Sequence, residues 1–226
     1  MITDYTIIRA RRKTISIGIR DDRVIVRAPM FYQMEDIAGF VAEKEGWITA
    51  NLAKSLERLE KRNAFSLDYG DMVLYRGEEY PIVAKSGNLV EFDCKAFNIP
   101  PGLTPERVKS ACIQLYRVLA KQYLPGRTYE LAKEMDVVPS MVKINGAKAR
   151  WGSCGSKKII NYSWMLIMAD DDVIDYIIAH ELSHILEMNH SRSFWDIVET
   201  VIPDYKARQE RLHLLQERVL NEDWRE

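Results

Sequence analysis

The stretch DDDVIDYIIAHELSHILEMNH, residues 170–190, joins the start of a helix to a cluster of histidines. Aspartate at a helix N-cap accepts hydrogen bonds from unpaired backbone amides and complements the helix dipole, so residues 170–172 predict a helix start. The largely apolar run at residues 173–179 indicates that this helix is buried. Because residues four apart differ by about 40° around an α-helix, His180 and His184 project from one face and can bind one metal ion.

Glu181 and His190 complete the predicted site. Glu181 lies about 60° from His184 around the helix, too far to be an obvious ligand but placed to reach a metal-bound water as a general base. The chain has four histidines, and three of them fall within eleven residues. Three imidazoles and a water form an open tetrahedral site of the catalytic zinc type. We therefore predict one zinc ion per chain, bound by His180, His184 and His190. Isolated core or surface histidines are the alternative interpretation.

The connection to His190 requires a sharp turn. The chain has to leave the helix after Ile185 or Leu186, and Asn189 is the residue most tolerant of a left-handed conformation, so we expect that conformation there. Ser193-Phe194-Trp195-Asp196 has the form of a capping box and predicts the start of the next helix.

Outward from this stretch, the pattern predicts an α+β chain with a boundary at the breaker cluster of residues 98–102. Residues 1–102 are expected to form a β-rich module with a long helix, and residues 103–226 the catalytic domain. The module would contain hairpins at residues 14–26 and 72–83, one helix at 33–61 and a strand at 89–92. The catalytic domain would contain a helix after Pro105, a shorter one after Pro125-Gly126, and strands at 142–144, 147–154 and 158–162 joined by tight turns.

Composition excludes several classes of protein. The chain is 47% apolar, and 32 basic against 33 acidic residues leave a net charge of -1, which gives no overall footprint for nucleic acid. The basic run Arg9–Lys13 is interpreted as a solvated face, so a nucleic-acid partner is not expected. The start lacks the apolar core of a signal peptide, and no stretch approaches the ~18 apolar residues of a membrane span. We expect a cytoplasmic protein without a membrane partner.

Three widely spaced cysteines, Cys94, Cys112 and Cys154, argue against a disulfide framework or a thiolate metal site. Cys112 lies on the apolar stripe of its predicted helix and is expected in the core. The fourth histidine, His213, lies on the final amphipathic helix and is expected to be solvated.

Several motifs together resemble the YgjP-like family of zinc metallopeptidase-related proteins and, more distantly, the SprT-like proteases. They are the HELSH motif at residues 180–184, NHS at 189–191, FW at 194–195, RWGSC at 150–154 and NYS at 161–163. The resemblance covers nearly the whole chain and implies a zincin-like fold, with the HExxH helix beneath a small sheet. It implies His180, His184 and His190 as zinc ligands and Glu181 as the base. Metzincins share the ligand spacing but have glycine where this chain has Glu187, and Glu199 is a rival third ligand because gluzincins use a glutamate.

The resemblance also assigns a role to the strand that contains Arg150 and Trp151. In a zincin this strand is the edge above the catalytic helix, where an extended substrate adds as a further strand. Arg150 could stabilise the oxyanion or bind an acidic group of the substrate, and a structural ion pair is equally open. Trp151 is interpreted as core, and Cys154 as a packing residue rather than a zinc thiolate.

We therefore predict a zinc-dependent metallohydrolase, specifically a metallopeptidase that cleaves a peptide or protein substrate with a zinc-bound water and Glu181. One alternative is a metal-dependent nucleotide pyrophosphatase, because Lys148, Arg150, Lys157 and Lys158 could bind phosphates. Another is a binding protein that uses the zincin scaffold without turnover. Cleavage specificity, the role of the module and the oligomeric state stay open.

Overall fold

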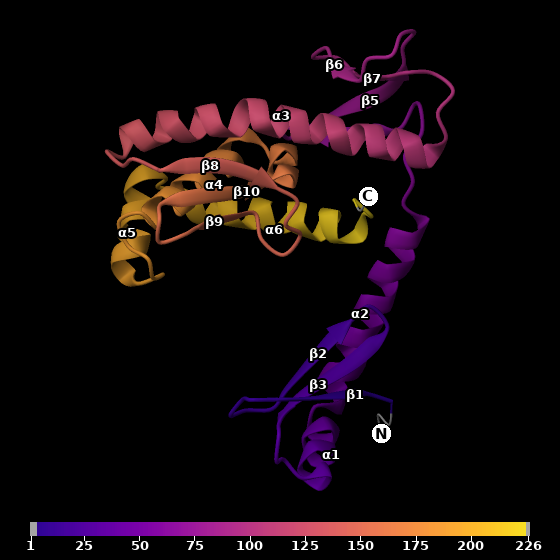
Figure 1. The fold of residues 1–226 in the computed structure, drawn as a ribbon, viewed down its shortest axis with the longest axis vertical. Coiled ribbons are helices and arrows are strands. Elements are labelled where there is room, and N and C mark those ends of the chain that lie inside the picture. The colour runs from indigo at the N-terminus through magenta and orange to yellow at the C-terminus, as the bar shows by residue number, and fades with distance from the viewer. Residues whose placement is uncertain (1–3, 225–226) are drawn as a thin grey trace. The chain divides into compact units, whose positions relative to one another are not determined.

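The computed structural model describes residues 4–224 and is mixed α+β, as predicted (Figure 1). The chain divides into two compact units. The first unit contains the described residues up to Phe65, together with Val219–Asp223, and the second contains Ser66–Arg218 and Trp224. Among residues 4–224, no helix is both long enough and apolar enough to cross a membrane.

The first unit is a three-stranded sheet covered by two helices. The predicted hairpin is confirmed: its strands pair antiparallel around a turn in which Asp21 has a left-handed φ of 55°. The first strand was not predicted, and it pairs parallel with the third to give the order β1-β3-β2. The elements are β1 (Thr6–Ala10), β2 (Ser16–Arg20), β3 (Arg23–Pro29), α1 (Met34–Glu43) and α2 (Glu45–Ala64).

The single helix predicted for residues 33–61 is wrong, because Lys44 separates α1 from α2. Ile37 and Val41 of α1 and Ile48 of α2 pack into one core cluster with the buried residues of β3. A straight helix of that length would span about 43 Å, whereas the seven residues of β3 reach only about 23 Å. The break at Lys44 lets both helices contribute to one small core.

The second unit begins with a four-stranded sheet in the order β4-β5-β7-β6. The predicted second hairpin is confirmed as the antiparallel pair β4–β5. Strand β7 was not predicted, because it overlaps the breaker cluster, yet its three residues are all buried and pair parallel with β5. The strands are β4 (Met72–Tyr75), β5 (Glu78–Ala84), β6 (Glu91–Phe92) and β7 (Phe97–Ile99).

The chain divides after Phe65 and not at the boundary expected at residue 102. The β4–β5 turn explains the difference, because it docks on residues 167–171 of the predicted catalytic domain. The backbone amides of Arg76 and Gly77 donate to the carbonyls of Ile167 and Met168, and the Arg76 guanidinium pairs with Asp171. Residues 66–102 therefore belong with the predicted catalytic domain.

Helix α3 (Pro105–Glu134) runs through Pro125, where the sequence predicted a new, shorter helix. Proline inside a helix costs about 3 kcal/mol, since it removes a backbone hydrogen bond and clashes with the preceding turn. Leu124 and Leu131 on either side of Pro125 are both buried. Continuous burial of this stripe offsets the local cost. Cys112 is fully buried on the same helix, as predicted.

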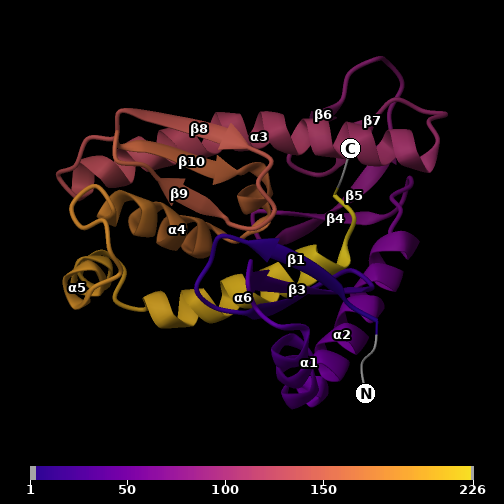
Figure 2. The same ribbon diagram turned by 60° about the horizontal axis from the view of Figure 1, so that its bottom comes forward.

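The remaining elements form a second sheet and the helices that hold the site. The strands predicted at 142–144 and 158–162 are confirmed, but only residues 152–154 of the strand predicted at 147–154 form a strand. β8 pairs parallel with β10, so the turn at residues 145–146 does not join a hairpin. Among the described residues β9 pairs only with β10, so it is the edge strand of this sheet, and it lies next to α4 (Figure 2). The strands are β8 (Met141–Asn145), β9 (Gly152–Cys154) and β10 (Ile159–Ser163), and the helices are η1 (Trp164–Met168), α4 (Asp171–Ser183), α5 (Arg192–Val201) and α6 (Tyr205–Asn221).

Candidate metal centre

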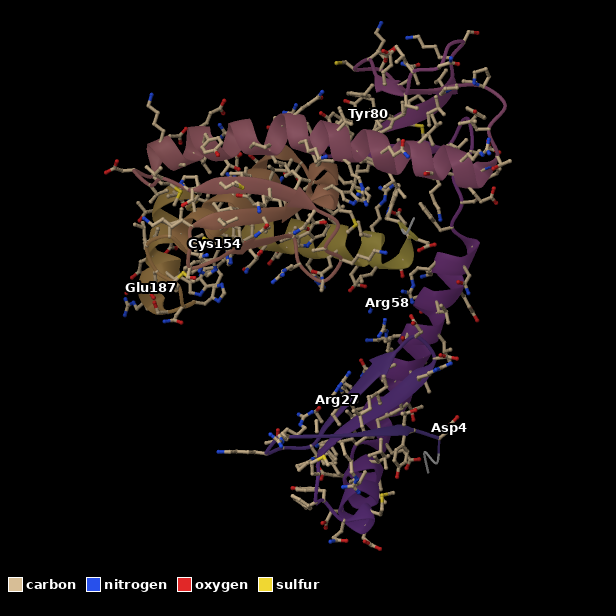
Figure 3. All side chains as sticks on the ribbon, viewed as in Figure 1. Asp4, Arg27, Arg58, Tyr80, Cys154 and Glu187 are labelled. Atoms are coloured by element: carbon tan, nitrogen blue, oxygen red, sulfur yellow. The ribbon has the colours of Figure 1, made fainter. Side chains whose placement is uncertain are left out.

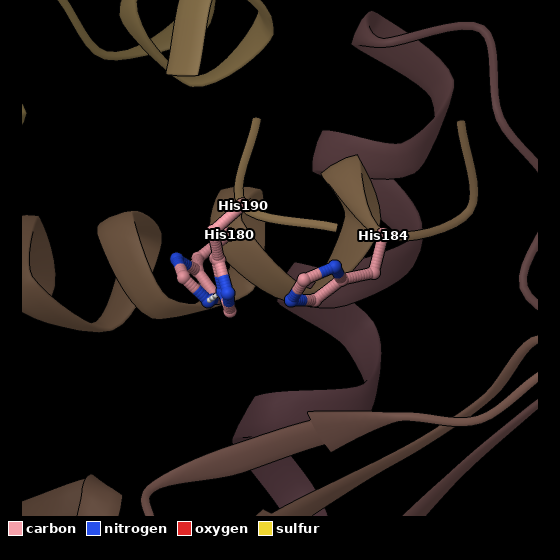
Figure 4. Close-up of side chains that lie close together, drawn as sticks. All are labelled: His180, His184 and His190. Carbon is pink, nitrogen blue, oxygen red and sulfur yellow. Dashed lines mark hydrogen bonds between the residues drawn. The ribbon is translucent and has the colours of Figure 1, made fainter. Parts of the chain in front are cut away.

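Helix α4 begins as predicted: Asp170 is its N-cap, and the Asp170 side chain accepts a hydrogen bond from the amide of Val173. His180 and His184 lie near its C-terminal end, and His190 lies in the connection to α5 (Figure 4). One ligand nitrogen from each of the three rings lies within 4.8 Å of the others. Nε2 of His180 and Nε2 of His190 are 3.1 Å apart. The structure thus brings together the three histidines that the spacing predicted as ligands.

The turn that brings His190 back differs from the prediction. Helix α4 ends at Ser183, two residues earlier than the earliest predicted exit, and the Ser183 carbonyl accepts from the amides of both Leu186 and Glu187. The expected left-handed conformation at Asn189 is wrong, because Asn189 does not have a positive φ. Its amide instead donates to the Glu187 carboxylate at 3.3 Å. The turn is therefore held by backbone hydrogen bonds and by the Glu187 carboxylate, and it needs no residue in a left-handed conformation.

The same turn sets the tautomer of His184. Its Nδ1 lies 3.2 Å from the carbonyl oxygen of Glu187, which can only accept, so Nδ1 holds the proton. Nε2 of His184 therefore keeps a free lone pair. A backbone carbonyl that holds one ring nitrogen in this way is a common support for a metal-ligating histidine.

Phe194 packs against all three histidine rings, a role that the sequence did not reveal. Its side chain is fully buried on α5, and its ring centroid lies 4.9 Å from His180, 4.6 Å from His184 and 4.8 Å from His190. The N-cap of α5 is Ser191, whose hydroxyl accepts from the Phe194 amide, so the predicted capping box starting at Ser193 is wrong. The earlier cap sets the helical phase that turns Phe194 toward the histidines.

An aromatic column supports the outer side of His190. The His190 ring stacks on Trp195 at 5.9 Å, Trp195 stacks on Tyr205 at 5.3 Å, and Tyr205 stacks on Tyr176 at 6.5 Å. Tyr176 lies one turn before His180 on α4. The column therefore connects the histidine in the loop to the helix that holds the other two.

Burial keeps the histidines of α4 in the neutral form that binds metals. Burial, followed by the charges of the nearby His184 and His190, lowers the pKa of His180 to about 4. Burial also lowers the pKa of His184. His180 Nδ1 is buried without a hydrogen-bond partner in the described part of the chain. A cation bound among these rings would meet neutral imidazoles with available lone pairs.

Glu181 is a buried carboxylate next to the three histidines in the fold. Its side chain is 5% exposed, and its Oε2 has no hydrogen-bond partner among the described residues. Burial raises its pKa to about 7, while the charge of Arg150 and a backbone hydrogen bond from Cys154 oppose the rise. A buried carboxylate without a partner is costly, and a nearby cation would both satisfy it and lower its pKa. The donor set therefore fits a bound metal ion.

Gly152 in β9 is required for the position of Glu181, although the sequence showed it only as part of a motif. A Cβ atom at Gly152 would lie 2.5 Å from Oε1, 2.7 Å from Cγ and 2.8 Å from Cδ of Glu181. These separations are shorter than any packing contact allows. The glutamate thus occupies the space that any other residue at 152 would fill.

Arg150 was expected inside the edge strand, but it lies two residues before β9. Its side chain is exposed, and it is close enough to Glu181 for its charge to lower the glutamate's pKa. Among residues 4–224, Arg150 forms no ion pair, so the structural ion pair considered for it is absent there. Trp151 is half-buried, and its carbonyl accepts from the amide of Ser163.

Three other predicted candidates lie outside the histidine cluster. Cys154, which is labelled in Figure 3, is half-buried. Burial, followed by the Glu181 charge, raises its pKa, which keeps the thiol protonated. Glu199 is exposed on α5 and is not among the clustered ligand atoms. His213 is exposed on α6, as predicted.

Comparison with known proteins identifies the family of the chain. Residues 13–214 match the model of the YgjP-like family, described as a metallopeptidase domain. No curated protein matches the chain. One solved structure that it resembles is the metallopeptidase zymogen abylysin of Pyrococcus abyssi, with 22% identity, coverage of 39% of this chain and 90% of that one, and a TM-score of 0.37. Because the family match spans most of its length, the chain belongs to the YgjP-like metallopeptidase family.

Proposed function

We propose that this metallopeptidase-family chain is a zinc-dependent peptidase in which Glu181 is the general base. The observation that supports the proposal most directly is the buried Glu181 Oε2, which has no hydrogen-bond partner among residues 4–224. It lies in the helical turn between two of three converging imidazoles. One zinc ion held by His180, His184 and His190 would supply Lewis acidity, making water a better nucleophile and polarising the scissile carbonyl.

The chain's own residues divide the remaining work. Glu181 accepts a proton from the attacking water on Oε2 and passes it to the leaving amine, so one carboxylate is first base and then acid. Its position against Gly152 keeps the side chain at the edge of the sheet. The free edge of β9 offers backbone groups to which an extended peptide can pair as an additional strand. Arg150 would stabilise the developing oxyanion or bind an acidic group of the substrate.

A first experiment compares the purified wild-type protein with Glu181→Gln. The wild type, prepared without chelator, should contain about one zinc per chain and should cleave members of a peptide library. Glu181→Gln keeps all three ligands but removes the base, so it should retain zinc and lose at least 10²-fold in kcat, roughly the contribution of one general base.

Three results would contradict the proposal. They are metal-free wild-type protein, equal peptide cleavage by Glu181→Gln, and hydrolysis of a nucleotide panel in place of peptides. The last result would favour the phosphoanhydride hydrolase. Zinc binding without hydrolysis of either panel would favour a non-catalytic binding protein.

A further inference from the structure

The segment that contains β8, β9 and β10 has a one-sided charge. From Ser140 to Ser163 it holds five basic residues and no acidic one, although the whole chain has a net charge of -1. The five are Lys143, Lys148, Arg150, Lys157 and Lys158. Positive charge therefore gathers on the sheet that lies beside the candidate metal centre.

Three of these cations differ from most arginines around α4. Arg150, Lys157 and Lys158 are exposed, and none of them forms an ion pair within residues 4–224. By contrast, the arginines near the start of α4 are paired with its carboxylates, as with Arg127 and Asp175 at 2.7 Å. Unpaired cations keep their full charge available for a partner.

The three cations stand at the two ends of β9. Arg150 precedes the strand, and Lys157 and Lys158 form the turn that follows it. Backbone hydrogen bonds fix this turn: Lys158 donates to Gly155, and Gly155 donates to Ile159. Between the two ends lies the point where Gly152 touches Glu181. A chain paired along β9 would thus meet positive charge on both sides of the catalytic carboxylate.

We propose that the site selects peptide segments with acidic side chains on both sides of the scissile bond. The proposal rests on the peptidase function proposed above and adds its substrate class. Backbone pairing along an edge strand is largely independent of sequence, so side-chain charges decide which peptides bind. The three residues of β9 span about 10 Å at ~3.3 Å per residue, so the two charged ends lie at least about three residues of bound peptide apart.

A nucleic acid is also a polyanion, but the segment suits it less well. Single strands bind by stacking bases on exposed aromatic faces as well as by charge. The aromatic residues between Ser140 and Ser163 are Trp151, which is half-buried, and Tyr162, which is fully buried. The edge strand instead offers backbone amides and carbonyls, the groups to which another peptide pairs.

The test measures binding without turnover, using full-length, zinc-loaded Glu181→Gln protein. Three fluorescent decapeptides share a neutral centre of four residues flanked by glutamate, glutamine or lysine. At low salt the glutamate peptide should bind about tenfold tighter than the glutamine peptide, and the lysine peptide should bind weakest. The advantage should shrink as salt is raised, because exposed charges are screened.

Two double variants of the Glu181→Gln protein test which lysines cause the preference for the glutamate peptide. Lys157→Glu with Lys158→Glu should reverse the preference, so that the lysine peptide binds best. Lys121→Glu with Lys133→Glu makes the same change in charge at exposed positions of α3, which lies toward β8 rather than β9, and should leave the preference unchanged.

Equal binding of the three peptides would overturn the inference. An equal loss of the preference for the glutamate peptide in both double variants would also overturn it. Tight binding of a single-stranded oligonucleotide with no binding of the glutamate peptide would also overturn it. Wild-type cleavage of peptides regardless of charge would sink the inference and leave the proposed function intact. Charge-selective binding without cleavage by the wild type would support the inference and count against the proposed function.

Discussion

The two ends of α4 treat their charged groups in opposite ways. At the N-terminal end every aspartate has an arginine partner, whereas Glu181 at the C-terminal end forms no ion pair with residues 4–224 and the histidines face one another. The pairs are Asp170 with Arg211, Asp171 with Arg76, Asp172 with Arg208 and Arg211, and Asp175 with Arg127. Satisfied charges stabilise a fold, whereas unsatisfied buried groups cost free energy and mark the place where chemistry is done.

This contrast shows why one helix can be both scaffold and site. The paired end attaches α4 to the β4–β5 turn, to α3 and to α6, so the position of the helix is fixed before a metal binds. The C-terminal end is then held in place although Glu181 Oε2 and His180 Nδ1 have no hydrogen-bond partner among the described residues. Substitutions at the first end should change stability, and substitutions at the second should change metal binding or catalysis.

Gly152→Ala should give the largest effect. A Cβ at this position would lie within 2.8 Å of three Glu181 side-chain atoms, so the carboxylate must move. Because misplacement of a catalytic group by about 1 Å can cost 10²-fold, we expect kcat to fall by about 100-fold with zinc content unchanged. Gly155→Ala is the control, because its Cβ would meet nothing closer than 3.9 Å. Full activity in Gly152→Ala would show that this contact does not position the base.

Glu181→Gln should stabilise the metal-free protein in a pH-dependent way. Burial raises the pKa of Glu181 from its ordinary 4.5 to about 7, so between these values the folded state holds a proton that the unfolded state has released. The contribution of Glu181 to wild-type stability therefore falls as pH rises through this window, by up to about 1.4 kcal/mol per pH unit, whereas the histidines contribute equally in both proteins. The glutamine variant lacks this loss of stability, because glutamine does not titrate. Urea unfolding with chelator at pH 5, 6 and 7 should show a widening gap, and a constant gap would contradict the burial of the charge.

Trp195→Leu should weaken zinc binding. The indole stacks on the His190 ring and is itself backed by Tyr205, so its removal frees the loop ligand to rotate. Loss of such a supporting contact typically costs 10- to 100-fold in metal affinity, and we expect about tenfold because the ligands themselves remain. Competition with a chromogenic chelator measures the dissociation constant.

Trp195→Phe is the matched variant for this prediction, since it keeps an aromatic face against His190. It should retain most of the affinity, and the melting temperature of the metal-free protein should change little in either variant. Equal zinc affinity in Trp195→Leu and wild type would show that the column does not orient His190.

Asp175→Asn tests the paired end and should have the smallest effect. It breaks a two-pronged contact in which both oxygens of Asp175 accept from Arg127 at 2.7 Å. Because the pair is partly exposed, we expect a loss of about 1 kcal/mol of unfolding free energy. Zinc affinity should be unchanged. Glu130→Gln, at the more exposed second partner of Arg127, should cost less. A loss of zinc affinity in Asp175→Asn would contradict the separation of a stabilising N-terminal end of α4 from a metal-binding C-terminal end.

Local patterns predicted the start of α4 and its two histidines, but not the turn to His190 or the N-cap of α5. The cap at Asp170, the burial of α4 and the convergence of His180 and His184 all depend on residues within a few turns of one another. Prediction failed where distant packing outweighed a local preference. Pro125 suggested a new helix, but buried leucines on both sides keep α3 continuous, and the single helix predicted for residues 33–61 breaks at Lys44 so that both parts reach one core.

By itself, the sequence determined the helix, its cap and the chemical identity of the groups that it presents, because spacing on a helix follows from 3.6 residues per turn. Only the tertiary structure decided that Gly152 makes room for Glu181, that Phe194 packs under all three histidines and that the β4–β5 hairpin belongs to the second unit. Those contacts join residues far apart in the chain. No local periodicity encodes them, because they depend on how whole elements pack and on which side chains exclude one another.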